Sequence, residues 1–405
     1  MLDDFGQRIR DIILSEMDLS RELSDEEICD LIGSVVSREA RDRPMTIKDR
    51  AELERTIFNS LRKLDVLQEL VDDRDVTEIM VNGPNDIFYE KAGRIQRFKG
   101  HFSPEEKLED VIQQIVGRHN RVVNQASPIV DTRLSDGSRV NIVLNPISIG
   151  GSAVSIRKFP EHPMSMERLV EIEALSPAVA RLLQILTQAK YNIFISGGTG
   201  SGKTTFLNAL SQYIPDDERI ITIEDSAELQ LLGAKNIVRL ETRNANTDGV
   251  TPITIRDLIR TALRMRPDRI IVGECRGAEA LDMLQAMNTG HDGSLSTGHA
   301  NSPHDIISRI ETMVLQGQDF PLNAIRQQIA SGIDIIVQLG RLRDKSRRVL
   351  EISEVDGFMD GEIVLHTLYR FEETAVLDSG RIQGFLKKAG TLCHTDKLMA
   401  AGLSV

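Results

Sequence analysis

The sequence predicts an α/β protein in three parts: a helical N-terminal extension (residues 1–70), an α+β N-terminal domain (71–160), and a larger α/β domain with C-terminal strands and a tail (161–405). Three observations support this division. Apolar residues recur at helical spacing in the first part, and short strand patterns surround one helix in the second. In the third part short apolar strands alternate with helical segments, which is typical of a parallel sheet covered on both faces.

The N-terminal extension is expected to form charged amphipathic helices. Ser24 precedes three acidic residues, and Glu27 stands at the third helical position, which is the pattern of a capping box. Apolar residues then recur every three or four positions from Ile28 to Val36, and a second run of this kind ends at Leu64. We therefore expect a small helical bundle or a docking arm.

The second part is expected to combine short strands with one helix. Asp136-Gly137 is a turn sequence between two of the strands. The segment 103–106 (SPEE) combines an N-cap, a proline at the first helical position and a capping box, which predicts a helix from there to about His119. A proline-containing linker follows at about 160–165. The expected strands cover 76–81, 87–90, 95–98, 129–134, 139–144 and 153–159.

The third part opens with a helix from Ser165 and then alternates strands with helices. After Ile333 the pattern returns to strands and includes a basic stretch from Arg341 to Arg348. Strands are expected over 191–196, 219–224, 269–272 and 295–297.

Composition disfavours several classes of protein. With 49 basic and 61 acidic residues the net charge is −12, which argues against a nucleic-acid coat or a protein held on anionic lipid by bulk charge. Aromatic residues make up 4%, too few to favour a protein that stacks bases. No apolar run approaches the ~18 residues of a membrane span, and the acidic N-terminus lacks a leader pattern. Three separated cysteines fit a reducing compartment and no tetracysteine zinc site. We expect a cytoplasmic protein with no integral membrane segment and no nucleic-acid partner.

The most specific feature is GGTGSGKT (197–204), which matches G-x-x-x-x-G-K-[ST] between an expected strand and an expected helix. Its glycines allow backbone N–H groups to surround phosphate oxygens, and the helix N-terminus adds a positive dipole end. Lys203 would reach the β- and γ-phosphates of a nucleotide, and the Thr204 hydroxyl would bind Mg²⁺. The expected nucleotide-binding residues of this segment are Gly198, Thr199, Gly200, Ser201, Gly202, Lys203, Thr204 and Thr205.

Two acidic clusters follow expected strands, at the edge where a parallel sheet presents ligands. In ITIEDSAE (221–228) a strand ends at Glu224, and Asp225 and Glu228 follow. In RIIVGE (269–274) an aliphatic strand and a glycine precede Glu274. Glutamate reaches ~1.5 Å further than the aspartate usual in a Walker B strand, so we expect it to act on a metal through water. A metal-side acid and a base for water would turn nucleotide binding into hydrolysis. Solvent-exposed acids without a role are the alternative interpretation.

Histidines and arginines complete the set of candidate residues. His291 and His299 flank the strand expected at 295–297, and no further ligands at suitable spacing suggest zinc. A hydrogen-bonding sensor of the γ-phosphate is favoured, with structural histidines as the alternative. Arg256 and Arg260 lie one helical turn apart and so share one basic face of a helix. This face either supplies positive charge to a phosphate or is simply solvated. Arg139 and Arg157 lie on strands of the second part, and phosphoryl transfer needs cationic charge of this kind.

Four ordered segments together resemble a known family. GGTGSGKTT, IEDSAEL, IIVGECRG and GHDGSLSTGHAN are similar to the Walker A, Asp box, Walker B and His box of the type II/IV secretion ATPase superfamily. Upstream, DGSRVN, SIRKF and the helical extension resemble the CpaF/TadA branch, which serves tight-adherence (Tad/Flp) pili. The resemblance runs from about Asp65 to at least Phe371.

This resemblance implies a PAS-like fold for the α+β domain and a RecA-like P-loop ATPase for the third part. It implies a homo-hexamer, cytoplasmic and peripheral at the inner membrane, that hydrolyses ATP with Mg²⁺ on inner-membrane platform proteins. Such a motor would assemble Tad/Flp type IV pili, and some members also retract them. The implied site residues are Lys203 and Thr204 on phosphate and Mg²⁺, Glu228 as general base, Glu274 as Walker B acid, His299 near the γ-phosphate, and Arg139 and Arg157 in the crevice between domains.

Three alternatives stay open at this point. The same chemistry could serve a conjugative or effector-delivering type IV secretion system. A DNA helicase or translocase could use the same RecA-like core, although net charge and few aromatic residues disfavour it. A nucleotide-gated switch that binds without repeated turnover is a third class, against which the two acidic clusters argue.

Overall fold

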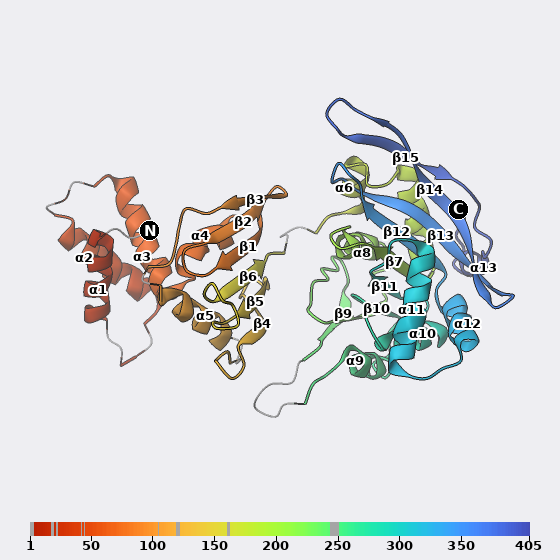
Figure 1. The fold of residues 1–405 in the computed structure, drawn as a ribbon, viewed down its shortest axis with the longest axis horizontal. Coiled ribbons are helices and arrows are strands. Elements are labelled where there is room, and N and C mark those ends of the chain that lie inside the picture. Colours follow the sequence, from red (N-terminus) through yellow and green to blue (C-terminus); the bar gives the residue numbers. More distant parts are fainter. Residues whose placement is uncertain are drawn as a thin grey trace. The chain divides into compact units, whose positions relative to one another are not determined.

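A computed structural model describes residues 4–17, 20–21, 23–41, 43, 45–103, 105–118, 122–159, 163–243 and 251–405. The chain divides into two compact units, an N-terminal unit, Met1–Glu161, and a C-terminal unit, His162–Val405 (Figure 1). Three residues named in the predictions lie outside the described residues. Pro104 and His119 belong to the helix predicted for the α+β domain, and Pro160 belongs to the predicted linker. None of the helices in the described ranges is both long and apolar enough to cross a bilayer.

The N-terminal unit begins with three helices, α1 (Asp4–Glu16), α2 (Asp25–Glu39) and α3 (Ile47–Arg62). The predicted capping box is confirmed: the Ser24 hydroxyl accepts a hydrogen bond from the Glu27 N–H, and the Glu27 carboxylate accepts one from the Ser24 N–H. The apolar positions of the three helices meet in one cluster that does not include the following sheet. Its buried members are Ile9, Ile13, Ile28, Ile32, Val35, Val36 and Ile57.

An antiparallel sheet follows, in the order β3-β2-β1-β6-β5-β4. Helix α5 (Lys107–Gly117) buries Val111 and Ile112 against one face of this sheet, where Val140 and Ile156 point. The sheet is preceded by η1 (Asp65–Leu67) and α4 (Gln68–Asp72). Its strands are β1 (Val76–Asn82), β2 (Ile87–Lys91), β3 (Arg94–Arg97), β4 (Ile129–Arg133), β5 (Arg139–Val143) and β6 (Ala153–Arg157).

The predicted start of α5 is wrong. The residue before the helix is Glu106, which makes no side-chain cap, and α5 begins at Lys107. The N–H of Leu108 bonds to the Glu105 carbonyl, and that of Glu109 to the Glu106 carbonyl. These bonds, from residue i to residue i−3, form a turn at 105–106 that leads into the helix. Glu105 and Glu106 therefore precede the first turn of α5, whose acidic residues are Glu109 and Asp110.

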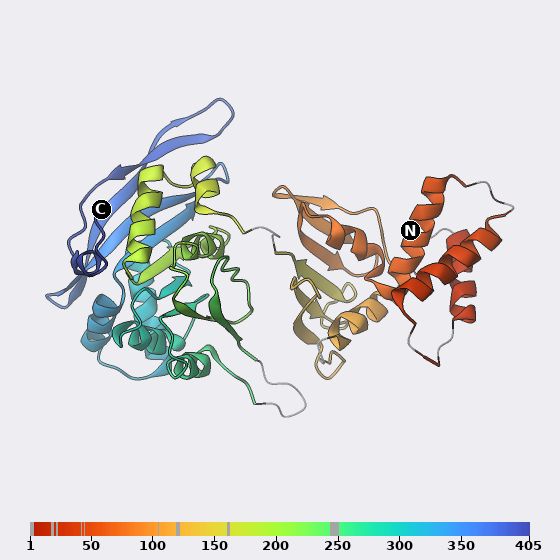
Figure 2. The same ribbon diagram turned by 180° about the vertical axis from the view of Figure 1, so that it is seen from behind.

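The C-terminal unit is built on one sheet in the order β15-β14-β13-β12-β7-β11-β10-β8-β9. The pairs from β12 to β9 are parallel, as predicted, and β13 to β15 continue the sheet antiparallel (Figure 2). Strand β9 at one edge was not expected, because charged and polar residues interrupt its short apolar sequence NIVRLE. The strands are β7 (Ile193–Gly197), β8 (Arg219–Glu224), β9 (Asn236–Glu241), β10 (Arg269–Val272), β11 (Leu295–Gly298), β12 (Ile335–Arg341), β13 (Arg347–Met359), β14 (Glu362–Val376) and β15 (Ile382–Lys388).

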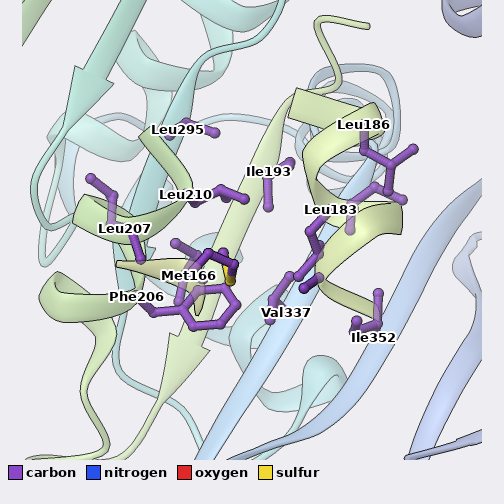
Figure 3. Close-up of a cluster of buried hydrophobic side chains, with 14 of the residues drawn as sticks. Met166, Leu183, Leu186, Ile193, Phe206, Leu207, Leu210, Leu295, Val337 and Ile352 are labelled. Atoms are coloured by element: carbon purple, nitrogen blue, oxygen red, sulfur yellow. The ribbon is translucent and has the colours of Figure 1, made fainter. Parts of the chain in front are cut away.

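Helices cover both faces of the parallel strands. On one face Leu183 of α7 and Phe206 of α8 pack with Ile193 and Val337 of the sheet (Figure 3). On the other face α9 to α12 enclose a second cluster that includes Phe194 and Ile336. The first set comprises α6 (Met166–Glu171), α7 (Pro177–Gln188) and α8 (Lys203–Ser211), and the second α9 (Ile255–Ala262), α10 (Glu279–Asn288), α11 (Pro303–Gly317) and α12 (Leu322–Gly332).

Hydrogen bonds from buried side chains stabilise the amino-terminal edge of the parallel strands. Arg269, which is fully buried, donates to the carboxylate of Glu218 and, at 2.8 Å, to the Thr187 carbonyl. The Asn192 side chain donates to the Gly332 carbonyl at 2.8 Å and accepts from the Ser294 N–H at 3.0 Å. These bonds cross-link the starts of β7, β10, β11 and β12.

The C-terminal segment, with α13 (Asp396–Ala400), is tied to the same edge. The buried Glu354 carboxylate accepts the N–H groups of Cys393 and His394, at 2.7 and 2.8 Å. Lys397 Nζ lies 2.6 Å from an Asp334 carboxylate oxygen. The Tyr191 hydroxyl donates to the His394 carbonyl at 2.6 Å, and burial together with the nearby Asp334 charge raises its pKa to about 12.

Asp344→Asn is expected to destabilise the C-terminal unit in a pH-dependent way. The Asp344 carboxylate accepts the N–H groups of Ile382 (2.7 Å) and Ser346 (2.9 Å), and these bonds lower its pKa to about 2. A carboxyl with a lowered pKa stabilises the folded state above its unfolded pKa of ~3.9, and this contribution disappears as the pH falls towards 2.

We expect the free energy of unfolding, measured in urea, to fall by about 1 kcal/mol at pH 7 and the difference from wild type to shrink below pH 4. Asp378→Asn, in the exposed turn after β14, is the control and should be neutral. An equal loss at pH 7 and pH 3 would contradict this account.

Candidate active site

The glycine-rich loop joins β7 to α8 at the carboxyl-terminal edge of the parallel strands. A side chain at Gly197 would approach Ser201 Oγ to 2.5 Å and the Leu339 carbonyl oxygen to 2.7 Å, so only glycine fits there. Gly200 and Gly202 have φ of +71° and +96°, in the left-handed region that favours glycine. Helix α8 starts at Lys203 without a side-chain cap, which leaves its first N–H groups available to an anion. The local geometry therefore fits a phosphate group.

Lys203 is held at the base of this loop. Its Nζ donates to the carbonyls of Gly197 and Gly198, at 3.1 and 3.2 Å, and lies 3.1 Å from His299 Nδ1. Burial lowers the pKa of Lys203, and the nearby Glu274 charge opposes this shift. Thr204 and Thr205 follow in the first turn of α8, while Thr199 and Ser201 lie in the loop itself.

His299 connects Lys203 to Glu274. It follows β11, and its Nε2 lies 2.8 Å from Glu274 Oε1. Burial and then the Lys203 charge lower the pKa of His299, so the imidazole is neutral at pH 7. The neutral imidazole can accept from Lys203 through Nδ1, and its Nε2 is in close contact with the Glu274 carboxylate. His291, by contrast, lies 3.3 Å from the Ala286 carbonyl through Nδ1 and belongs to the loop before β11.

Glu274 lies two residues after β10 and faces two partners. Its second oxygen, Oε2, accepts from Arg276 at 2.6 Å, which raises the pKa of the arginine. Lys203, His299, Glu274 and Arg276 therefore form one polar chain across the carboxyl-terminal edges of β7, β10 and β11.

Glu224 at the end of β8 organises the second acidic cluster. Its Oε1 accepts the N–H groups of both Glu228 and Leu229 at 2.8 Å, and the residue is 3% exposed. A side chain at Gly273 would lie 2.9 Å from Glu224 Cγ, which explains the glycine before Glu274. Glu228 is half-buried, and its charge contributes to the raised pKa of Arg276. The two acidic clusters are thus neighbours in space.

The arginines of α9 are paired with an acid on the next helix. Arg256 Nε and Arg260 Nε lie 2.8 and 2.9 Å from the two carboxylate oxygens of Asp282 on α10, a residue that is 4% exposed. Both arginines therefore pair with a buried carboxylate that needs cationic partners, while the side chain of Arg260 stays 58% exposed.

Arg139 and Arg157 belong to the N-terminal unit and are direct partners across β5 and β6. Arg133 of β4 is in turn the direct partner of Arg139, so three arginines form one row on the face opposite the core. Like charges directly opposite one another destabilise a sheet. Sequence reasoning missed Arg133, although the turn at Asp136-Gly137 fixes its position opposite Arg139.

Gln338 of β12 was also missed. It is 3% exposed, pairs in register with Ser196 of β7, and its Nε2 donates to the Ala300 carbonyl at 3.2 Å. It therefore holds the residue after His299 against the strand that leads into the glycine-rich loop. Its polar side chain inside the apolar run IIVQLG is the signal that could have indicated it.

Comparison with known families identifies the chain. The family model described as type II/IV secretion system protein matches residues 60–383. The chain belongs to this family. The predicted superfamily is thereby confirmed, and the match includes the whole glycine-rich loop, both acidic clusters and the arginine row. The helical extension before residue 60 and the last residues after 383 lie outside the family match.

Curated relatives in the family align over most of their own length. The conjugal transfer protein TrbB of Rhizobium radiobacter is 32% identical over 332 residues, which cover 81% of this chain and 98% of TrbB. The type IV secretion system protein PtlH of Bordetella pertussis is 33% identical over 320 residues, or 73% of this chain and 94% of PtlH.

Solved structures agree with the predicted fold. The pilus retraction motor PilT with bound ADP matches with a TM-score of 0.55 at 22% identity, over 82% of this chain and 84% of PilT. The Legionella pneumophila ATPase DotB matches with a TM-score of 0.53 at 22% identity, over 72% of this chain and 80% of DotB. The RecA-like fold expected for this family is therefore confirmed.

Proposed function

We propose that this protein hydrolyses ATP to ADP and phosphate in a reaction that depends on Mg²⁺. The observation that supports this most strongly is the chain Lys203–His299–Glu274 at the base of a glycine-rich loop. It brings a cation for phosphate oxygens, a neutral imidazole and a carboxylate into one set of close polar contacts. Loop backbone, helix N-terminus and this chain converge on the same edge of the sheet.

In this proposal each residue has a separate task. The N–H groups of the loop and of Thr204 and Thr205 bind phosphate oxygens, and Lys203 exchanges its carbonyl partners for the β- and γ-phosphates. The Thr204 hydroxyl and, through water, Glu274 would hold Mg²⁺, which neutralises phosphate charge when bound. His299 would hydrogen-bond to the γ-phosphate. Because it also lies beside Glu274, the position of that carboxylate would depend on whether the γ-phosphate is bound.

Glu228 is the proposed general base that takes a proton from the attacking water. Glu224 supports this role, because it holds the backbone of Glu228 through two N–H groups and so fixes where the side chain starts. Of the two carboxylate oxygens of Glu224, Oε1 accepts both of these bonds.

Phosphate release from ATP by the purified protein tests the proposal. We expect repeated turnover with Mg²⁺, none with excess chelator, and no stimulation by DNA. A single turnover would support a nucleotide switch instead, and stimulation by DNA would support a translocase.

The arginine row of the N-terminal unit is proposed to serve the nucleotide as well. Glu78 of β1 lies opposite Arg157 of β6, and a bound triphosphate would bring more negative charge to these arginines than one carboxylate does. We propose that Arg139 and Arg157 contact the nucleotide when ATP binds, and that Arg157 stabilises charge in the transition state.

Arg157→Ala is therefore expected to lower turnover by about 10²-fold while nucleotide affinity changes less than tenfold. Phosphate release and fluorescent-nucleotide titration measure the two quantities. Arg94→Ala, on strand β3 at the other end of the same sheet, is the control. Unchanged turnover in Arg157→Ala would exclude this role.

We propose that the protein works as a cytoplasmic homo-hexamer, peripheral at the inner membrane, on platform proteins of a pilus or secretion machine. Head-to-tail contacts that close into a ring would convert nucleotide-driven motion in one subunit into pressure on the next. Light scattering with and without a non-hydrolysable ATP analogue tests this, and a monomer under both conditions would exclude it.

Two cargo assignments compete within the family. The helical extension outside the family match supports a CpaF/TadA-type motor that assembles, and in some members retracts, Tad/Flp pili. The names of TrbB and PtlH favour the alternative, an ATPase of a conjugative or effector-delivering type IV secretion system. Co-purification from membranes with pilus-platform or with type IV secretion components distinguishes the two.

A further inference from the structure

The basic stretch between β12 and β13 has no role in the proposed chemistry so far. Two of its arginines are structural: Arg343 pairs with Glu373, and the buried Arg348 donates to the carbonyls of Glu173 and Ile382, at 2.9 and 3.0 Å. Arg347 takes a different direction. Its Nε donates to the Gly200 carbonyl of the glycine-rich loop at 2.8 Å, across 147 positions of the sequence.

The position of Arg347 follows from the strand register. Val349, two residues later, is buried in the cluster that α8 covers, so Arg347 lies on the same face of the sheet as α8. Its Cδ lies 3.5 Å from where a Cβ of Gly202 would be. The side chain therefore packs along the outer side of the loop and bonds to the carbonyl at its tip.

Two side chains of the described residues hydrogen-bond to carbonyls of this loop, Lys203 from inside and Arg347 from outside. The ammonium of Lys203 must leave the carbonyls of Gly197 and Gly198 when it turns to a phosphate. The Nε–H of Arg347 has no such second role, so its bond to the Gly200 carbonyl can stay in place when a phosphate binds. A loop with four glycines in six positions loses much conformational freedom on binding unless something already fixes it.

Charge in the hairpin favours the same bond. Arg341 at the end of β12 is the direct cross-strand partner of Arg347, and both are exposed. Two like charges directly opposite each other on neighbouring strands repel. The carbonyl dipole of Gly200, and an anion bound in the loop beyond it, are therefore favourable neighbours for the Arg347 guanidinium.

We propose that Arg347 is a positioning residue that fixes the tip of the glycine-rich loop from outside, so that the loop is ready for a nucleoside di- or triphosphate. This inference rests on the proposed function. A bond that stays the same before, during and after hydrolysis would contribute equally to ground and transition states. Its loss should therefore raise KM and leave kcat nearly unchanged.

The experiment compares Arg347→Ala, Arg347→Lys and Arg341→Ala in the full-length protein. Arg341→Ala removes a neighbouring positive charge but no bond to the loop, so it separates charge from hydrogen bonding. We expect roughly tenfold weaker binding of both ATP and ADP in Arg347→Ala, with kcat within about twofold of wild type. Arg347→Lys, which keeps the charge but lacks Nε–H, should lose most of the same affinity, and Arg341→Ala should stay within about twofold.

A second readout does not need nucleotide. Hydrogen exchange of the loop amides should be faster in nucleotide-free Arg347→Ala than in wild type, and unchanged in Arg341→Ala. Equal loss of affinity in Arg341→Ala and Arg347→Ala would show a charge effect and overturn the inference. Wild-type affinity in Arg347→Ala would overturn it too, while leaving ATP hydrolysis by the wild type intact. A wild-type protein that binds no nucleotide would instead overturn the proposed function, and this inference with it.

Discussion

Lys203→Ala is expected to lower phosphate release from ATP by about 10³-fold, close to complete loss. The ammonium is the cation held inside the loop, and the charge that develops between the β- and γ-phosphates would lose its main stabilisation. The substitution also leaves the carbonyls of Gly197 and Gly198 and His299 Nδ1 without their donor. Initial rates of phosphate release measure the effect.

The control for this change is Lys235→Ala, in the same unit. Lys235 is exposed and pairs with Asp216 on the surface, so its removal should leave turnover unchanged. Circular dichroism of both variants shows whether they are folded. Wild-type turnover in Lys203→Ala would place the active site somewhere other than at this loop.

Glu228→Gln and Glu274→Gln are expected to fail in different ways. Glu228→Gln removes the proposed base and keeps the loop, so we expect retained ATP affinity with turnover lowered by ~10²-fold or more. In Glu274→Gln we expect an increase in the Mg²⁺ concentration that gives half-maximal activity, because a metal-side carboxylate is lost.

Magnesium titrations and nucleotide binding, measured on both variants, distinguish these outcomes. Glu171→Gln, which removes an exposed carboxylate paired with Arg168, is the matched control. If Glu274→Gln kept its magnesium requirement while that of Glu228→Gln shifted, the two roles would be exchanged.

Local patterns in the sequence were enough to locate most of the fold. The glycine-rich loop, the Ser24 cap and the parallel strands of the C-terminal unit each depend on residues close together in the chain. Predictions became wrong or incomplete where a neighbour distant in sequence decides the outcome. The start of α5 depends on the turn before it, and β9 depends on its pairing with β8 at the edge of the sheet.

The candidate site shows the same division. Lys203 and His299 were each indicated by their own motif, but their contact spans 96 positions and follows only from the alignment of β7 with β11. Asp282 gave no signal, because a single acid on a helix does not indicate which arginines it will meet. The role of Arg347 was hidden in a basic stretch whose members point to different partners.

The two edges of the parallel sheet differ in stiffness. At the amino-terminal edge, Arg269, Asn192 and Glu354 tie strands and the C-terminal segment together with buried bonds, and opening any of them leaves an unpaired polar group. The opposite edge carries glycines and bonds that a ligand can exchange. Elastic deformation caused by ligands will therefore concentrate at the second edge, and the first will move as a rigid body. A spectroscopic label near Met399, which is exposed on α13, would report the orientation of the whole unit and be insensitive to its loops.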